Sequence, residues 1–128
     1  SEGATFAKAV TSAEIHEAML NPGSDSLYAV EADPPATAEG WAAAEAAAAK
    51  VIDGAVQLQT SARPTEQPDW IRISKAVEDA ARRSAAAVRN KDVEALALAN
   101  GDFTAQCEDC HNAFRDIDGH GMMSEPGQ

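Results

Sequence analysis

Apolar residues recur at helical spacing in four segments of the chain, and no segment shows the strict alternation of a strand. The first segment begins at Thr11-Ser12-Ala13-Glu14, where the Thr11 side chain can cap the first turn and Glu14 can complete a capping box. Pro22 falls inside the segment and predicts a kink or a break near Asn21, because proline cannot donate an intrahelical hydrogen bond. Asp33-Pro34-Pro35 ends the segment. Its apolar positions are Ile15, Met19, Leu27 and Val30.

The second and third segments predict two helices joined by a loop. The second runs from about 37 to 58, and its many alanines would let a neighbouring helix approach closely; a loop over 60–67 follows. The third begins at Pro68, since proline is tolerated in a first turn. The charged run Glu78-Asp79 with Arg82-Arg83 predicts a solvated face with i, i+4 ion pairs. The inward stripe of the third helix comprises Trp70, Ile73, Val77, Ala80, Ala81, Ser84 and Val88.

The fourth segment starts near Asp92, after a short connection at Asn90-Lys91, and continues to Phe114. Asn100-Gly101 is expected to be a weak point in this helix, and the glycine-containing tail over 118–128 is expected to be irregular. Four helices with short connections predict an all-α protein. The expected architecture is an antiparallel four-helix bundle that makes residues 1–128 one domain.

Composition indicates that such a bundle has a thin core. The chain has 29 alanines, whereas Val, Leu, Ile, Phe, Met, Trp and Tyr together number 26. Because burial stabilises in proportion to apolar area, either the helices pack very closely or a group outside the sequence fills the middle. The net charge of −11 argues against binding to nucleic acid or to an anionic membrane. No apolar run reaches the length of about 20 residues that a membrane span needs.

The two cysteines of the chain lie in Cys107-Glu108-Asp109-Cys110-His111, a C-x-x-C-H sequence that is the attachment signature of c-type haem. On a helix the two thiols share a face, so both can bond one porphyrin while His111 points at its iron. A redox dithiol is disfavoured because that chemistry expects a βαβ setting. Structural zinc is disfavoured because the chain has no second cysteine pair. We therefore expect one covalent haem c, enclosed by the bundle, with small alanine side chains leaving room for it.

A C-terminal C-x-x-C-H on the last helix of an alanine-rich four-helix bundle resembles the class II cytochromes c, the cytochrome c-prime family. The resemblance covers nearly the whole chain and is greatest to the six-coordinate, low-spin branch. The further stretches that carry it are 14–22 with Ser24-Asp25 and Leu27-Tyr28, Thr37-Ala38-Glu39-Gly40-Trp41, and Phe114 after the haem motif. The resemblance implies a haem-binding four-helix bundle, and it implies that two copies can pair as a homodimer.

The resemblance leaves the sixth iron ligand open. In that branch a first-helix methionine, six residues before the proline, binds the iron opposite the histidine; here that position holds His16. Either His16 replaces it, giving bis-histidine iron, or Met19 one turn later does. These two residues are about 60° apart on an α-helix, so both are expected to face the haem, and the register favours His16. The remaining alternatives are an exposed His16 beside an ordinary core Met19, an open sixth site, and a tail ligand among His120, Met122 and Met123.

These inferences predict a soluble monohaem c-type cytochrome that acts as an electron carrier and not as an enzyme. A bis-histidine pair predicts a lower potential than a histidine–methionine pair. The expected partners are redox proteins with a basic docking surface, since the chain is acidic. The chain begins at Ser1, which predicts export to the periplasm with loss of a signal peptide. The alternative is a haem protein that binds or senses diatomic gases at an open or labile sixth site.

Overall fold

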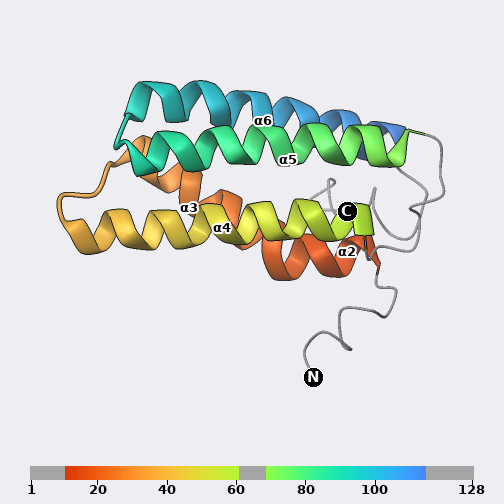
Figure 1. The fold of residues 1–128 in the computed structure, drawn as a ribbon, viewed down its shortest axis with the longest axis horizontal. Coiled ribbons are helices and arrows are strands. Elements are labelled where there is room, and N and C mark those ends of the chain that lie inside the picture. Colours follow the sequence, from red (N-terminus) through yellow and green to blue (C-terminus); the bar gives the residue numbers. More distant parts are fainter. Residues whose placement is uncertain (1–10, 61–68, 115–128) are drawn as a thin grey trace.

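A computed structural model describes residues 11–60 and 69–114 of the 128-residue chain. In these two ranges all regular structure is helical, and the chain reverses direction from each long helix to the next (Figure 1). Helices that follow one another in sequence pack together, and α3 also contacts α6, so the all-α antiparallel bundle is confirmed for this part of the chain. The elements are α2 (Ser12–Ile15), η1 (His16–Leu20), α3 (Asn21–Ala32), α4 (Ala38–Thr60), α5 (Trp70–Arg89) and α6 (Val93–Ala113).

The first helical segment begins as expected but does not break at its proline. Thr11 and Glu14 form both hydrogen bonds of the capping box, which confirms the predicted start. The helix does not break near Asn21, but its α-helical hydrogen bonding is disturbed directly before that residue, within His16–Leu20. The chain stays helical through η1, a π-helical turn, and continues into α3. The backbone N–H of Asn21 donates to the carbonyl of His16, five residues earlier, so a widened turn absorbs the proline.

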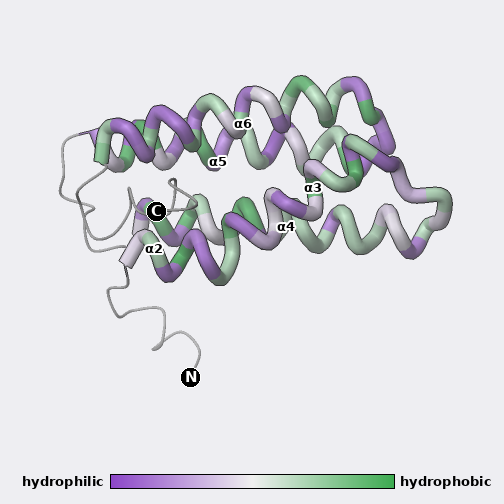
Figure 2. The backbone as a smooth tube through the Cα atoms, turned by 180° about the vertical axis from the view of Figure 1, so that it is seen from behind, coloured by the Kyte–Doolittle hydropathy of each residue, from purple (hydrophilic) through white to green (hydrophobic). Residues whose placement is uncertain are grey.

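Helices α4 and α5 form the most closely filled part of the bundle. The residues of α5 predicted to point inward are all buried, and α4 buries alanines together with Val51 and Leu58. Hydrophobic and hydrophilic residues are interspersed along the helices, as one buried face on each requires (Figure 2). Trp70 begins α5 with no exposed surface and donates from Nε1 to the Leu58 carbonyl at 2.6 Å. Its ring packs against that of Phe114, with the two planes inclined by 60°. These contacts join the ends of α4, α5 and α6.

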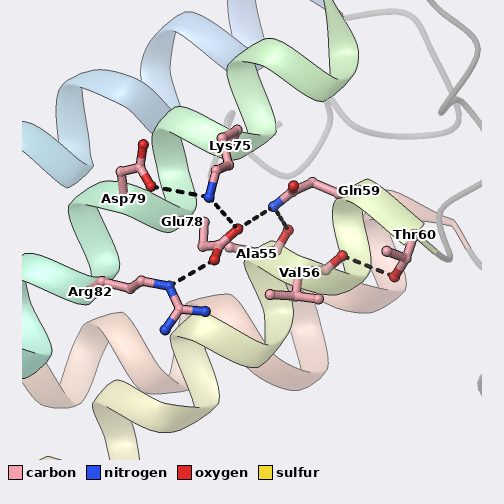
Figure 3. A network of polar contacts seen from close by, with 8 residues as sticks. All are labelled: Ala55, Val56, Gln59, Thr60, Lys75, Glu78, Asp79 and Arg82. Carbon is pink, nitrogen blue, oxygen red and sulfur yellow. Dashed lines mark hydrogen bonds and ion pairs between the residues drawn. The ribbon is translucent and has the colours of Figure 1, made fainter.

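The charged run on α5 is solvated, as its sequence predicts, at Asp79, Arg82 and Arg83, but not at Glu78. Glu78 is only 6% exposed and accepts a hydrogen bond from Gln59 of α4 at 2.8 Å (Figure 3). It also pairs with Arg82 at 2.7 Å, which confirms one i, i+4 pair. Arg83 pairs instead with Asp102 of α6. Glu78 therefore connects α5 to α4, and Arg83 connects α5 to α6.

Helix α6 is continuous across the predicted weak point. Asp92 caps its first turn by accepting from the backbone N–H of Ala95, close to the expected start. Asn100 is 2% exposed, and its side chain bonds to Ser84 of α5 and to the Leu27 carbonyl of α3. The expectation of a soft helix at this position is wrong, since tertiary hydrogen bonds outweigh the low helix propensity of asparagine.

Thr60, where the predicted loop over 60–67 was expected to begin, is the last residue of α4. The rest of that predicted loop, the predicted helix start at Pro68 and the tail over 118–128 with His120, Met122 and Met123 lie outside the described ranges. Among the described helices, none combines the length and the apolar character needed to cross a membrane.

Candidate haem site between the first and last helices

A cavity of about 460 Å³ lies between the η1–α3 segment and α6. Its volume is within the range of about 300–1,000 Å³ that is typical of cofactor and ligand pockets. The cavity is bounded by polar, aromatic and sulfur-bearing side chains drawn from both segments. They are His16, Leu20, Asn21, Ser24, Asp25 and Tyr28 on one side, and Phe103, Thr104, Cys107, Glu108 and His111 on α6.

His16 and His111 face each other across this cavity. Their Nε2 atoms are 3.3 Å apart although the residues are 95 positions apart in the chain. The ring centroids are 5.1 Å apart and the ring planes are inclined by 42°. Two imidazoles at this separation can share a hydrogen bond, and imidazole is also a common ligand of iron in proteins. The structure thus brings together the two histidines that the sequence singles out.

The ring of His16 is fixed by its own helix. Its side chain is 4% exposed, and Nδ1 lies 2.7 Å from the backbone carbonyl of Ser12. A carbonyl can only accept, so Nδ1 carries the proton and Nε2 presents its lone pair to the cavity. Burial lowers the pKa of His16, and the hydrogen bond to Ser12 opposes that shift to a smaller extent. A neutral imidazole with a hydrogen-bonded Nδ1–H is the form that binds metals, as in many histidine metal sites.

The two cysteines lie on the C-terminal half of α6, one turn apart and next to His111. Cys107 lines the cavity, whereas Cys110 is buried and is not among the lining residues. Burial raises the pKa of each thiol to about 12, and the negative charges near Cys107 contribute further. A redox dithiol needs a lowered thiol pKa, because the thiolate is the reactive form. These surroundings therefore disfavour the dithiol alternative.

Met19 is directed away from the cavity. It lies against α4, where a Cβ added to Gly54 would come within 3.1 Å of the Met19 Cβ, and it is not among the residues that line the cavity. The expectation that His16 and Met19 share one face is wrong, because it assumed α-helical spacing. The π turn changes the angle between them, since it has more than 3.6 residues per turn.

Alanine has a different role from the one that composition suggested. No alanine is among the residues lining the cavity, and the buried alanines belong mainly to α4 and α5. Small side chains therefore let α4 and α5 approach closely, and they do not create the space at the site. That space arises where the η1–α3 segment and α6 stand apart.

Two sets of hydrogen bonds join α3 to α6, one at the cavity and one next to it, and Thr104 and Asn100 were not identified as site residues from the sequence. The Tyr28 hydroxyl and Thr104 Oγ1 are 2.6 Å apart and connect α3 to α6. One turn further along α6, Asn100 donates to the Leu27 carbonyl and to Glu31 of α3. These links set the spacing of α3 and α6 next to the cavity. The pairing of residues more than 65 positions apart gives no local sequence signal.

The donor set fits a haem with two axial histidines. Metal–nitrogen bonds to histidine are about 2.0–2.1 Å in zinc sites, so two imidazoles in line across one ion lie about 4 Å apart. The His16–His111 pair at 3.3 Å is close to that separation and needs to open by less than about 1 Å. Within residues 11–60 and 69–114, no group of three or more His, Cys, Asp or Glu side chains is arranged to hold a metal ion.

Comparisons of the chain with family models, with curated proteins and with solved structures gave no match. The resemblance to the class II cytochromes c therefore stays a prediction from the residues quoted above.

Proposed function

We propose that this chain is a monohaem c-type cytochrome that carries electrons. Cys107 and Cys110 would hold the haem through thioether bonds, and His111 and His16 would be its two axial ligands. The observation that carries the proposal is the opposition of the two imidazoles, 3.3 Å apart at Nε2, in a cavity that Cys107 also lines. It brings a histidine of the first helical segment to the C-x-x-C-H motif of the last one.

The bound haem would supply reversible one-electron chemistry at its iron. The chain's part is to hold that centre in one geometry. His16 suits this task because it is buried and its ring is oriented by the Ser12 carbonyl. A carrier benefits from two fixed ligands, since neither has to leave when an electron is gained or lost. The same arrangement disfavours the gas-binding alternative, which requires an open or weakly held sixth position.

The charge of the chain supports a basic electron-transfer partner. Asp25 and Glu108 line the cavity, and the net charge of the chain is −11. Acidic groups around a redox centre attract positively charged partners and raise their association rate at low salt. Because covalent haem attachment takes place on the oxidising side of bacterial membranes, the proposal also implies export to the periplasm.

The first experiment tests the ligands. The full chain is produced with a c-type haem maturation system, and the oxidised protein is studied by visible absorption and EPR. We expect a low-spin bis-imidazole spectrum for the wild type and for Met19→Ala, and loss of that spectrum for His16→Ala. Met19→Ala is the matched control because it shortens a side chain of the same turn as His16, one that packs against α4. An axial methionine charge-transfer band in the wild type would contradict the assignment of His16.

The second experiment tests attachment and electron transfer. Haem should stay with the polypeptide after denaturation in the wild type and should be lost in Cys107→Ala/Cys110→Ala. Electron exchange with a cationic ruthenium hexaammine should slow as salt is added, whereas exchange with anionic ferricyanide should quicken, because salt screens attraction and repulsion alike. Equal salt dependence for the two reagents would contradict the acidic docking surface.

A further inference from the structure

The direction of His16 depends on the π turn that contains it. Leu20, Asn21, Ser24, Asp25 and Tyr28 line the cavity from α3 and the end of η1. If an ordinary α-helix preceded α3, Glu17 would lie on the same helix face as these lining residues. It is three residues before Leu20 and four before Asn21, and residues at those spacings share a face. His16 would then lie about 100° around the helix from Glu17. In the structure the reverse holds, since His16 is buried and Glu17 is exposed.

The hydrogen bonding of η1 accounts for this reversal. The Asn21 N–H donates to the His16 carbonyl, five residues earlier, so the turn holds one residue more than an α-helical turn. That extra residue brings His16, in place of Glu17, into line with Leu20 and Asn21. The widened turn therefore determines that His16 lies on the same face as the lining residues of α3.

Pro22 is the residue that disfavours an α-helical turn here. It has no N–H to donate to the carbonyl of Ala18, and its ring clashes with that carbonyl in an α-helix. The far side of the segment has little room to adjust. A Cβ on Gly23 would lie 2.5 Å from Val51 Cγ2 and 2.9 Å from the Ala47 carbonyl, so the start of α3 is in close contact with α4. The π turn lies on the N-terminal side of the proline, within His16–Leu20, away from this close contact.

We propose that Pro22 is a positioning residue for the axial ligand: it maintains the π turn that points His16, and not Glu17, into the cavity. This inference rests on the proposed haem ligation and adds a cause for it. Replacing the proline by alanine restores an N–H and permits α-helical spacing. In the α-helical spacing His16 turns away from the face that lines the cavity. The Glu17 carboxylate then occupies the position of the His16 imidazole.

The test compares variants of the full, haem-carrying chain. Pro22→Ala should lose the low-spin bis-imidazole EPR signal, and its reduced form should bind carbon monoxide rapidly. Pro34→Ala is the matched control, because Pro34 is exposed beyond the end of α3, and it should keep the wild-type spectrum. Pro22→Ala combined with deletion of the exposed Ala18 should recover the low-spin signal, since His16 then precedes Asn21 by four residues and returns to the face that lines the cavity.

Two results would overturn the inference: a wild-type spectrum for Pro22→Ala, or no recovery on deleting Ala18. If Pro22→Ala fails to fold or to attach haem, the double variant decides in the same way, since recovery supports the inference and failure contradicts it. The proposed function fails separately. His16→Ala with an unchanged spectrum, or a wild-type chain that attaches no haem, would reject the ligation itself whatever Pro22 does.

Discussion

Two contacts between helices in this bundle are built in opposite ways. Between α4 and α5, alanines and apolar side chains fill the contact, and Glu78 with Gln59 adds a polar link on its edge. Between α3 and α6, Asn100 and the Tyr28–Thr104 pair form hydrogen bonds that join the two helices. At this contact the two helices border an open cavity of about 460 Å³, and the two histidines are among the residues that line it.

The difference shows which half of the bundle its own side chains complete. The α4–α5 contact needs nothing from outside, because small residues allow the backbones to approach until the apolar surfaces meet. The α3–α6 contact combines a buried hydrogen bond from Asn100 and an exposed one at Tyr28 and Thr104 with a pocket that is open to solvent. A cavity of this size forfeits the dispersion contacts that close packing provides. We therefore expect the bound haem to matter far more for α3 and α6 than for α4 and α5.

The largest expected effect comes from removing the haem. We compare hydrogen exchange of the haem-carrying wild type with that of Cys107→Ala/Cys110→Ala produced without haem. Amides of η1 and α3 should lose most of their protection, since local opening there no longer breaks ligand bonds or packing. Amides in the middle of α4 and α5 should lose much less. The haem-free chain should also unfold with lower cooperativity.

An equal loss of protection in all helices would contradict the expected difference between the α3–α6 contact and the α4–α5 contact. Unchanged protection in η1 and α3, with one cooperative thermal transition, would show that the protein packs fully without a cofactor. Haem-carrying Met19→Ala serves as a reference for a local packing change, because Met19 of η1 packs against Gly54 of α4 and does not line the cavity.

An intermediate effect is expected from two glycines that test how closely the helices approach. Gly23 of α3 has Val51 and the Ala47 carbonyl within 3 Å of an added Cβ, whereas Gly101 of α6 has nothing within 4 Å. Gly23→Ala should destabilise the protein by about 1–3 kcal/mol, the usual cost of overpacking. Gly101→Ala should stabilise it by about 0.5–1 kcal/mol, because alanine loses less backbone entropy in a helix. Urea unfolding of the haem-carrying protein measures both.

Opposite signs for the two substitutions would sharpen the comparison, since the residue change is identical and the surroundings differ. If both stabilise the protein, α3 can move away from α4 at little cost. The starting register of α3, on which the π turn depends, would then be less firmly held than the contacts at Gly23 indicate.

The sequence predicted well those features that depend on residues close together in the chain. The capping box at Thr11 and Glu14, the cap at Asp92 and the inward stripe of α5 each depend on residues within a few positions of one another. The candidate ligands His16 and His111 also came from the sequence, the first through a resemblance and the second through the C-x-x-C-H motif. Their approach to 3.3 Å confirms that they lie together and leaves their role as ligands to be measured.

Features that depend on distant partners could not be predicted. Asn100 reads as a weak point in a helix, but its side chain bonds to α3 and α5. Glu78 reads as a surface charge, but Gln59 of α4 lies against it. The π turn is an intermediate case. Pro22 indicates that the α-helix is disturbed, but no residue near it in the sequence indicates that the preceding turn is π-helical or that Gly23 lies against α4.

The smallest expected effect concerns Glu78, the polar link on the edge of the α4–α5 contact. The hydrogen bond from Gln59 lowers the pKa of Glu78 below its usual value, partial burial opposes the shift, and Arg82 and Lys75 reinforce it. A lowered pKa in the folded state means that the carboxylate stabilises the fold above the ordinary glutamate pKa. This contribution is lost as the pH falls through the lower, folded-state pKa.

Glu78→Gln should therefore reduce the free energy of unfolding near neutral pH by less than about 1 kcal/mol, because Arg82 and Lys75 are more than half exposed and solvent screens their charges. The difference from wild type should shrink as the pH is lowered below the ordinary glutamate pKa. Gln59→Ala should also weaken this pH dependence, since it removes the largest cause of the shift. Urea unfolding of the haem-carrying proteins across this pH range measures the difference. A gap that grows toward low pH would contradict the assignment, because it would mean that Glu78 stabilises the α4–α5 contact in its protonated form.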